Sequence, residues 1–280
     1  MADFPRLLWG TVVLRPYVFA FLAMYIIAGC RHIGWKKTLG FIPVGYSLAW
    51  LSEFCSINWG FPYGDYHYIP STMGVELWVF GVPFMDSLSY VFLSYCSYSL
   101  ALFIMSPLSF SSGRLLIFDT PPVRRSSHTL ILGAFLFVML DVVIDPVALL
   151  GDRWFLGKIY GYRHVGSYFG IPMSNFAGWL VVGLVLVAAQ QFLDRVIPSG
   201  PRTYAGPAST IWGQVLGPIL YLSVMIFNIG VTFRIGENLL GMVDLMILTT
   251  LLVMTLFFTS FKLRNTAREI QPPGTALSNE

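Results

Sequence analysis

The sequence predicts an all-α integral membrane protein with about seven transmembrane helices packed in one bundle. Of the 280 residues, 56% are hydrophobic and only 11% are charged. The hydrophobic residues fall into runs of roughly 20, the length that crosses a bilayer as a helix. A soluble domain of this size could not bury so much apolar surface. A third observation, a repeated motif, predicts that two helical hairpins in the bundle are copies of each other.

Seven hydrophobic runs give the predicted helices in order. They cover residues 11–29, 38–56, 83–105, 129–148, 174–196, 210–231 and 239–261. The segments between them are too short for a separate soluble domain, so we expect a single transmembrane domain over residues 1–265. The Pro- and Gly-containing segment after the last run predicts a disordered C-terminal tail over residues 266–280.

The motif Phe-Gly-x-Pro occurs twice in the chain, at 80–83 and at 169–172. Each copy opens a long hydrophobic run. We therefore expect an internal repeat of two helical hairpins, with halves at about 38–105 and 129–196. Repeats in membrane proteins tend to meet at the functional site, so we expect that site between the two halves.

Polar residues in the predicted helices mark the candidate site. Glu53 lies 33 positions before Asp86, and Asp141 lies 34 positions before Asn175, so the two halves match. Ionisable residues inside a membrane are costly and usually functional. Asp145 follows Asp141 by four residues, so both carboxyl groups share one helix face. Two like charges this close in a low dielectric repel, and we expect one carboxyl to keep its proton above neutral pH.

The basic residues are divided unequally between the two ends of the predicted bundle. Of 17 Lys and Arg residues, 11 fall at the end that holds the connections after the first, third, fifth and seventh runs. By the positive-inside rule this end is cytoplasmic, which places the N-terminus outside and the C-terminus in the cytoplasm. Lipid phosphates account for basic residues at helix ends, so membrane lipid is the expected partner and no nucleic-acid site is predicted.

Two loops at the predicted outer end, 58–68 and 151–168, are rich in aromatic residues. An interfacial aromatic belt is the plainer explanation. The concentration in two loops on one side fits better with the mouth of a site for an apolar substrate, and aromatic faces can also stabilise a cation. The candidate binding residues are Trp59, Tyr63, Asp65, Tyr66 and Trp154 in the loops, and Trp179 after the second motif.

These residues together resemble a known family. Glu53 is followed by Gly-Phe-Pro-Tyr-Gly-Asp-Tyr-His-Tyr at 60–68, by Gly-Val-Pro at 81–83, by Asp-x-x-x-Asp-Pro at 141–146, and by Tyr-Phe-Gly-Ile-Pro-x-x-Asn-Phe-x-Gly-Trp at 168–179. The combination is similar to the integral-membrane carotenoid hydratases, of the gamma-carotene 1'-hydroxylase type in bacteria and the bisanhydrobacterioruberin hydratase type in archaea. It covers residues from about 40 to 180. The last two hydrophobic runs match only as helices.

The resemblance implies a hydro-lyase of a bacterial or archaeal cytoplasmic membrane, which adds water across the terminal 1,2 double bond of a carotenoid. The implied substrates are acyclic or monocyclic carotenoids such as lycopene, gamma-carotene or a C50 type, and the resemblance allows for a complex with other carotenoid enzymes. Protonation of the less substituted carbon and capture of the tertiary cation by water need no metal or redox cofactor. We expect Asp141 or Asp145 to donate the proton, Glu53 to be the second acid–base group, and Asp86 and Asn175 to hold the water.

Three other functions are compatible with parts of the pattern. A membrane prenyltransferase of the lycopene elongase type would use Asp141 and Asp145 to bind magnesium diphosphate, but a second Asp-rich motif is missing and Asp65 is a weak substitute. A di-iron hydroxylase needs several histidines at helical spacing, whereas the four histidines are scattered over different loops. A carotenoid or lipid transporter suits the repeat and the interrupted helices, and the sequence leaves it open.

Overall fold

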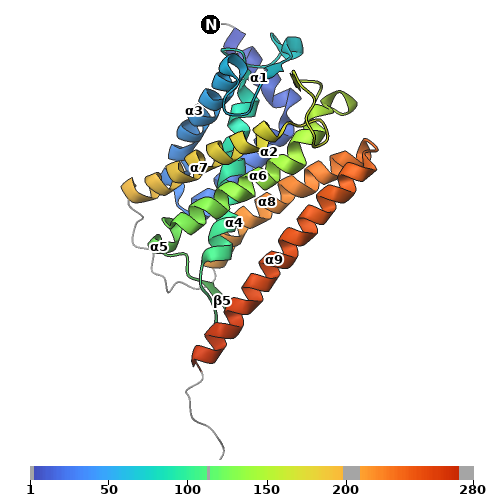
Figure 1. The fold of residues 1–280 in the computed structure, drawn as a ribbon. Helices are drawn as coiled ribbons and strands as arrows, with labels where there is room; N and C mark the ends of the chain where they lie inside the picture. Colours follow the sequence, from blue (N-terminus) through green and yellow to red (C-terminus); the bar gives the residue numbers. More distant parts are fainter. Residues whose placement is uncertain (1–2, 112–113, 198–208, 271–280) are drawn as a thin grey trace, which may run out of the picture.

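The structure, a computed structural model, describes residues 3–111, 114–197 and 209–270. The long helices of this part form a bundle (Figure 1), and each predicted hydrophobic run overlaps one of them, which confirms the all-α membrane fold. These helices are α2 (Pro16–His32), α3 (Trp35–Trp59), α4 (Phe84–Met105), α6 (Ser127–Leu149), α7 (Met173–Val196), α8 (Ser209–Arg234) and α9 (Asn238–Ile270).

The first predicted helix is broken. The chain bends by 89° between α1 (Asp3–Leu14) and α2. The break falls at Arg15, because Pro16 disfavours helical backbone angles at the residue before it. Arg15 accordingly has φ −124° and ψ 49°. The single run predicted at 11–29 therefore forms parts of two helices.

Five helices of the described chain are long and apolar enough to cross a membrane, namely α4, α6, α7, α8 and α9. The count is six if α1 and α2 are taken together as one broken span. α3 has 25 residues, but it is not among the five. It carries Lys36, Lys37 and Glu53, which make it more polar than its neighbours.

α4 is the central helix of the bundle, and most of its residues are buried. It packs against α2, α3, α6 and α8, while α7 packs against both α3 and α6. α9 lies at the outside against α8 (Figure 1), and its large hydrophobic side chains are mostly exposed, as expected for a lipid-facing helix. α9 continues to Ile270, past the start of the tail predicted at 266–280, and residues 271–280 lie outside the described part.

Short elements connect the helices at the two ends of the bundle. Two-stranded antiparallel pairs join β1 (Tyr66–Tyr68) with β6 (Tyr160–Tyr162), β2 (Trp78–Val79) with β3 (Val82–Pro83), and β4 (Leu108–Ser111) with β5 (Arg114–Ile117). The remaining short helices are η1 (Pro70–Thr72), α5 (Pro121–Arg124) and η2 (Gly151–Arg153). We call the end with β1, β2, β3 and β6 the hairpin end, and the end with β4, β5 and α5 the basic end.

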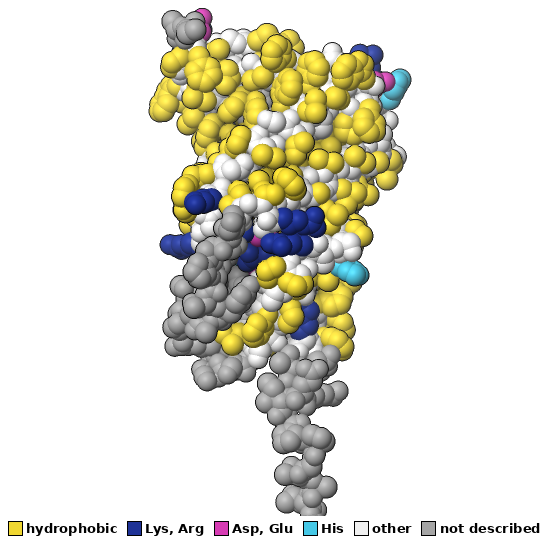
Figure 2. All heavy atoms as spheres, turned by 90° about the vertical axis from the view of Figure 1, so that its left-hand side faces the viewer, with side chains coloured by type: hydrophobic (Ala, Val, Ile, Leu, Met, Phe, Trp, Pro, Cys, Tyr) yellow, Lys and Arg dark blue, Asp and Glu magenta, His cyan; other side chains and the backbone are white. Residues whose placement is uncertain are grey.

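A network of buried ion pairs holds the basic end together. Asp119 accepts hydrogen bonds from Arg124 at 2.7 and 2.8 Å and lies 2.8 Å from His32. Asp194 forms ion pairs with Lys37 and Arg124. Burial alone would raise the pKa of Asp119, but the hydrogen bonds and charges of His32 and Arg124 outweigh it and lower that pKa below the usual range. In Figure 2 basic side chains gather in a band near the middle of the view, below a mainly hydrophobic surface.

Candidate active site

Four tyrosines face the bundle from a small sheet at the hairpin end. In the pairing of β1 with β6, Tyr66 lies opposite Tyr162 and Tyr68 opposite Tyr160. Alternate residues of a strand point to the same face, so the four tyrosines share one face and His67 lies on the other. β1 follows α3 and β6 follows α6, so the sheet joins the two aromatic loops.

The first group of carboxyls comes from α3 and α4. Glu53, in the last two turns of α3, accepts hydrogen bonds from the hydroxyls of Tyr66 and Tyr90. The Tyr68 hydroxyl lies 2.9 Å from Glu53 Oε2 and also contacts Asp86, in the first turn of α4. A hydroxyl has one proton, so Tyr68 donates to only one carboxyl at a time. A proton on the other carboxyl completes the second hydrogen bond.

The second group of carboxyls comes from α6. The Asp145 oxygens lie 2.8 Å from the Tyr160 hydroxyl and 2.7 Å from the Tyr162 hydroxyl. Asn175 Nδ2 lies 2.8 Å from both Asp145 Oδ2 and Asp141 Oδ2, so one amide joins the two acids. Asp141 is fully buried, and its Oδ1 has no hydrogen-bond partner in the described structure.

Neutral side chains surround these four carboxyls. Within the described ranges, none of Glu53, Asp86, Asp141 and Asp145 forms an ion pair with Lys, Arg or His. Burial raises the pKa of the Tyr160 hydroxyl, and the charge of Asp145 raises it further. The same two causes raise the pKa of Tyr162. These hydroxyls therefore stay protonated, and the carboxyls are the groups that can exchange protons.

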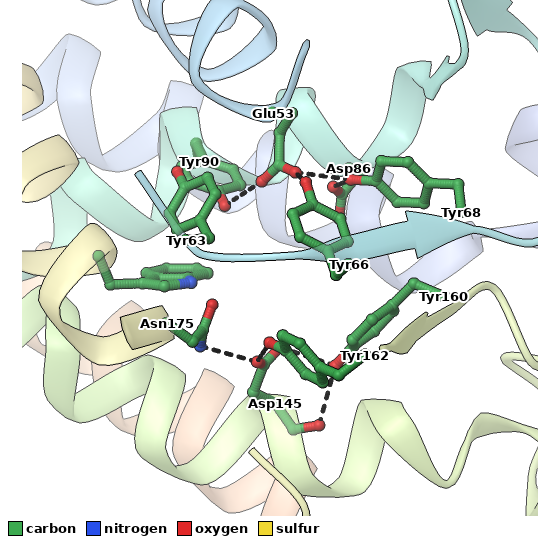
Figure 3. A pocket seen from close by; sticks show the side chains of 11 residues that line it. Glu53, Tyr63, Tyr66, Tyr68, Asp86, Tyr90, Asp145, Tyr160, Tyr162 and Asn175 are labelled. Carbon is green, nitrogen blue, oxygen red and sulfur yellow. Dashed lines mark hydrogen bonds between the residues drawn. The ribbon is translucent and has the colours of Figure 1, made fainter. Parts of the chain in front are cut away.

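A polar cavity of about 50 Å³ lies between the two groups (Figure 3). Figure 3 shows Glu53 and Asp86 on one side with Tyr63, Tyr68 and Tyr90 beside them, and Asp145 and Asn175 on the other side with Tyr160 and Tyr162. Asp141 does not line this cavity and is linked to it through Asn175. The lining residues are Glu53, Tyr63, Tyr66, Tyr68, Asp86, Tyr90, Asp145, Tyr160, Tyr162, Asn175 and Trp179.

An apolar cavity of about 100 Å³ adjoins the polar one. It is lined mainly by hydrophobic side chains of α2, α4, α6 and α8 and of the second aromatic loop. Both cavities share five lining residues, so two carboxyl groups face a polar space on one side and an apolar space on the other. The shared residues are Asp86, Tyr90, Asp145, Tyr160 and Trp179.

Stacked aromatic rings line the region that the two cavities share. The ring centroids of Tyr90 and Trp179 are 4.8 Å apart and nearly parallel, with 22° between the planes. Phe137 packs on Trp179 at 4.6 Å from the other helix of the second hairpin. Tyr90 and Trp179 occupy equivalent positions after the two Phe-Gly-x-Pro motifs, so the motif counterparts meet in the site.

The two copies of the motif adopt the same turn. Phe80 and Gly81 have φ of 49° and 83°, and Phe169 and Gly170 have φ of 45° and 89°. Positive φ at both central residues is the signature of a type I′ hairpin turn. Each turn leads directly into a helix, so the polar residue three positions after the proline enters the first turn of α4 or α7.

Comparison with protein families identifies the chain. The family model described as carotenoid biosynthesis protein matches residues 11–256. This chain belongs to that family. No curated protein and no solved structure shows significant similarity to it. The family match includes α8 and most of α9, beyond the segment of about 40–180 in which the sequence motifs lie.

Most of the predicted site residues of this carotenoid biosynthesis protein lie together. Seven line the polar cavity: Glu53, Tyr63, Tyr66, Asp86, Asp145, Asn175 and Trp179. Trp154 lines the apolar cavity, and Asp141 lies behind Asn175. Trp59 and Asp65 line neither cavity. Trp59, the last residue of α3, is 71% exposed, and Asp65 is exposed in the turn before β1.

Four tyrosines of the site were not among the predicted residues. They are Tyr68, Tyr90, Tyr160 and Tyr162. A signal for them exists in the sequence of this family member: each aromatic loop contains Tyr-x-Tyr, and this alternation places two tyrosines on one face of a strand. Tyr90 lies four residues after Asp86 and therefore on the same face of α4.

Proposed function

We propose that this protein is a carotenoid hydratase, which adds water across the terminal 1,2 double bond of an acyclic carotenoid end group and yields a tertiary alcohol. One observation carries the proposal: Asp86 and Asp145 lie where a polar cavity meets an apolar one. Hydration needs this combination, because an alkene must meet both an acid and a water molecule. Membership of the carotenoid biosynthesis family indicates the class of substrate.

The apolar cavity suits the hydrocarbon end of the substrate. Its lining includes aromatic and aliphatic side chains such as Phe21, Phe92 and Leu93. Phe92 and Leu93 lie six and seven positions after Asp86 along α4, or roughly 10 Å at 1.5 Å per residue. An end group that fills this cavity brings its terminal double bond to the carboxyls at the shared region.

We assign the proton donor to Asp145, with Asp141 as its supporting acid. One amide, Asn175, joins the two carboxyls, and two negative charges so close and so deeply buried would repel. One proton on the pair relieves this repulsion. Asp145 faces the substrate cavity, so it transfers the proton to C2 of the double bond. The π electrons form the new C–H bond, and C1 becomes a tertiary cation.

Glu53 and Asp86 hold the water in this mechanism. The polar cavity has about 50 Å³, more than the roughly 10–15 Å³ that a cavity needs to hold one water. The water oxygen bonds to C1, and one of its protons passes to Glu53. Glu53 and Asp145 line the same polar cavity, so water in that cavity can return the proton to Asp145. The faces of Tyr90 and Trp179 stabilise the cation before capture.

Pigment analysis tests the proposal in cells. A host that makes lycopene is grown with and without this chain, and its pigments are separated by mass. Addition of one or two water molecules to lycopene is the expected result. A prenylated pigment would favour the prenyltransferase alternative, and magnesium dependence with diphosphate release would support it. Unmodified lycopene would contradict enzymatic function and favour a transporter or binder.

We also propose that the two hairpins are copies related by a two-fold axis. The equal turns and the pairing of β1 with β6 support this relation. Helix packing supports it too: α3 contacts α4 and α7, and α6 contacts α7 and α4. Such an arrangement brings one acidic group from each half to the same cavity.

The orientation in the bilayer follows from the basic end, which we propose is cytoplasmic in a bacterial or archaeal membrane. The hairpin end and the N-terminus would then lie outside. The variant His67→Cys, on the exposed face of β1, tests this in intact cells after replacement of Cys30 and Cys55, with the buried Cys96 left in place. Reaction with an impermeant thiol reagent is expected. Reaction only after permeabilisation would reverse the orientation.

A further inference from the structure

Four aromatic rings close one side of the apolar cavity. Tyr17 of α2, Phe227 of α8 and Trp154 of the second loop line the cavity, and Phe155 packs over them from outside. Tyr17 stacks on Phe227 with centroids 5.5 Å apart and 18° between planes. Trp154 and Phe155 are 4.9 Å apart. We call these four residues the aromatic wall.

The surface outside the aromatic wall is apolar. Phe155 is 58% exposed, and Ile226, beside Phe227 on α8, is 59% exposed. Ile226 is on α8, which is long and apolar enough to cross a membrane, so this exposed side chain faces lipid chains, while Phe155 is on the adjoining loop. The aromatic wall therefore separates the apolar cavity from the bilayer by the thickness of a few side chains.

The apolar cavity is too small for a whole carotenoid. It measures about 100 Å³, whereas a cavity of about 150 Å³ takes a single benzene ring. A carotenoid is comparable in length to the bilayer hydrocarbon core, roughly 30 Å. Only the end of the substrate fits, and the rest of the chain must leave the cavity on one side.

The other sides of the cavity lead into the protein. α4 lines one side and is buried along most of its length, and α6 packs between α4, α7 and α8. On the side between α2 and α8, by contrast, the rings that cover the cavity are partly exposed. The substrate chain can leave the cavity on that side.

Polar contacts, one buried and one exposed, anchor the backbone around the aromatic wall. The Arg15 guanidinium, just before α2, donates to Glu76 at 2.9 and 3.0 Å and to the carbonyl of Leu156. Arg153 forms an ion pair with Glu237, in the turn between α8 and α9. These contacts hold the loop and both helices in place. Rotation of the rings, rather than movement of the backbone, is then the simplest way to open the wall.

We propose that the aromatic wall is the portal through which the carotenoid enters from the bilayer. The end group passes between Tyr17 and Phe227 to reach Asp86 and Asp145, and the polyene chain stays in the opened wall and the lipid. This inference rests on the proposed function for its substrate class. It implies that the end group, held in the cavity, determines specificity, while the length of the chain outside has little effect.

A reversible cross-link across the portal tests this. The variant carries Tyr17→Cys and Phe227→Cys, with Cys30 and Cys55 replaced by Ala, and is bridged by a short bifunctional thiol reagent that dithiothreitol cleaves. The readout is the rate at which detergent-solubilised protein takes up lycopene that remains bound through gel filtration. The bridge is expected to slow uptake by at least about tenfold, and dithiothreitol to restore it. Ile219→Cys, at an exposed position eight residues before Phe227 on α8, is the control for modification without bridging.

Uptake and hydration are separate readouts, so the two proposals fail separately. Uptake at the same rate in bridged and reduced protein would overturn the portal, whether or not the pigment is hydrated. Uptake that depends on the bridge, without hydration, would support the portal and contradict the proposed function. A second variant, Phe227→Ala, removes one ring and is expected to speed uptake, and slower uptake in a folded variant would also contradict the portal.

Discussion

The two ends of the bundle both bury carboxyl groups but surround them with opposite kinds of partner. At the basic end, Asp119 and Asp194 contact Arg124 and other cationic side chains. At the hairpin end, Glu53 and Asp145 contact tyrosine hydroxyls and an amide. A carboxylate paired with cations is fixed as an anion, whereas one held by neutral donors can gain and lose a proton. Buried acids at the first end hold helices together, and those at the second suit proton transfer.

The largest expected effect is at the hairpin end. Asp145→Asn keeps the shape and most hydrogen bonds of the side chain but removes the proton source. We expect hydration of lycopene to fall by about 10²–10⁴-fold, the usual contribution of general acid catalysis. Asp141→Asn is expected to act in the same direction. Product analysis of purified variants, with bound pigment and thermal stability as controls, measures this. Unchanged product in both variants would remove these acids from the mechanism.

The matching change at the basic end is expected to affect stability instead. Asp119→Asn removes the carboxylate that binds both buried Arg124 and buried His32, and of the ion pairs of Arg124 in the described chain only the longer contact with Asp194, at 3.5 Å, remains. Breaking a buried pair costs about 3–5 kcal/mol. Thermal unfolding in detergent should show a lower midpoint, while the folded fraction hydrates lycopene at the wild-type rate. If Asp119→Asn instead lost activity at full stability, the division of roles between the two ends would be wrong.

The stability difference between wild type and Asp119→Asn should depend on pH. The lowered pKa of Asp119 means that its carboxylate stabilises the fold fully above the unfolded-state pKa of about 3.9. This contribution is lost as the pH falls from that value through the lower folded-state pKa. The gap between the two unfolding midpoints should therefore be constant near neutral pH and shrink below about pH 4. A gap that widens in acid would contradict the assigned ion pairs.

A smaller effect is expected for the hydroxyl that joins Glu53 and Asp86. Tyr68→Phe removes a hydrogen bond to a charged group, worth about 1.5–3 kcal/mol, and should lower the hydration rate by about 10–100-fold. Tyr63→Phe is the matched control, because the Tyr63 hydroxyl pairs with Ser52 at 2.9 Å and not with a carboxyl. Steady-state rates of both variants make the comparison. Equal losses of hydration rate in the two variants would show that these tyrosines act by packing alone and not through a hydrogen bond to a carboxyl.

The smallest expected effect is on stability, at the two Phe-Gly-x-Pro turns whose similarity supports the proposed repeat. Gly81→Ala and Gly170→Ala force a side chain onto positive φ, which costs about 1–2 kcal/mol per residue. The added methyl group at Gly170 would also meet Leu149 at 3.0 Å, so its loss should be the larger of the two. Gly230→Ala, in open space on α8, is the control and should be neutral or slightly stabilising. Thermal unfolding midpoints of the three variants measure this effect. A lower midpoint for only one of the two turn variants would count against the proposal that the hairpins are copies.

Local patterns predicted much of the fold and part of the site. Hydrophobic runs located the helices, and the high cost of membrane-buried acids pointed to Glu53, Asp86 and Asp145. The bend at Arg15 was missed although Pro16 signals it, because the apolar run continues across it. Trp59 and Asp65 belong to the first aromatic loop in the sequence, but they lie at a helix end and in a turn, where both are exposed and line neither cavity.

The remaining features depend on residues that are far apart in sequence. The β1–β6 pairing joins residues more than 90 positions apart, and only this pairing brings four tyrosines over the carboxyls. At the basic end, Lys37 and Asp194 are 157 positions apart. The aromatic wall likewise combines α2, α8 and a loop. No local pattern specifies such contacts, because they follow from how the helices pack.

The most direct test of the central claim uses water labelled with ¹⁸O. Purified protein is incubated with lycopene in labelled water, without oxygen and with excess metal chelator, beside the Asp145→Asn variant. If acids at the hairpin end hydrate the alkene, the wild-type product carries one ¹⁸O atom in each new tertiary alcohol, and the variant forms almost none. Unlabelled alcohol, or lycopene of unchanged mass with the wild-type protein, would contradict the account.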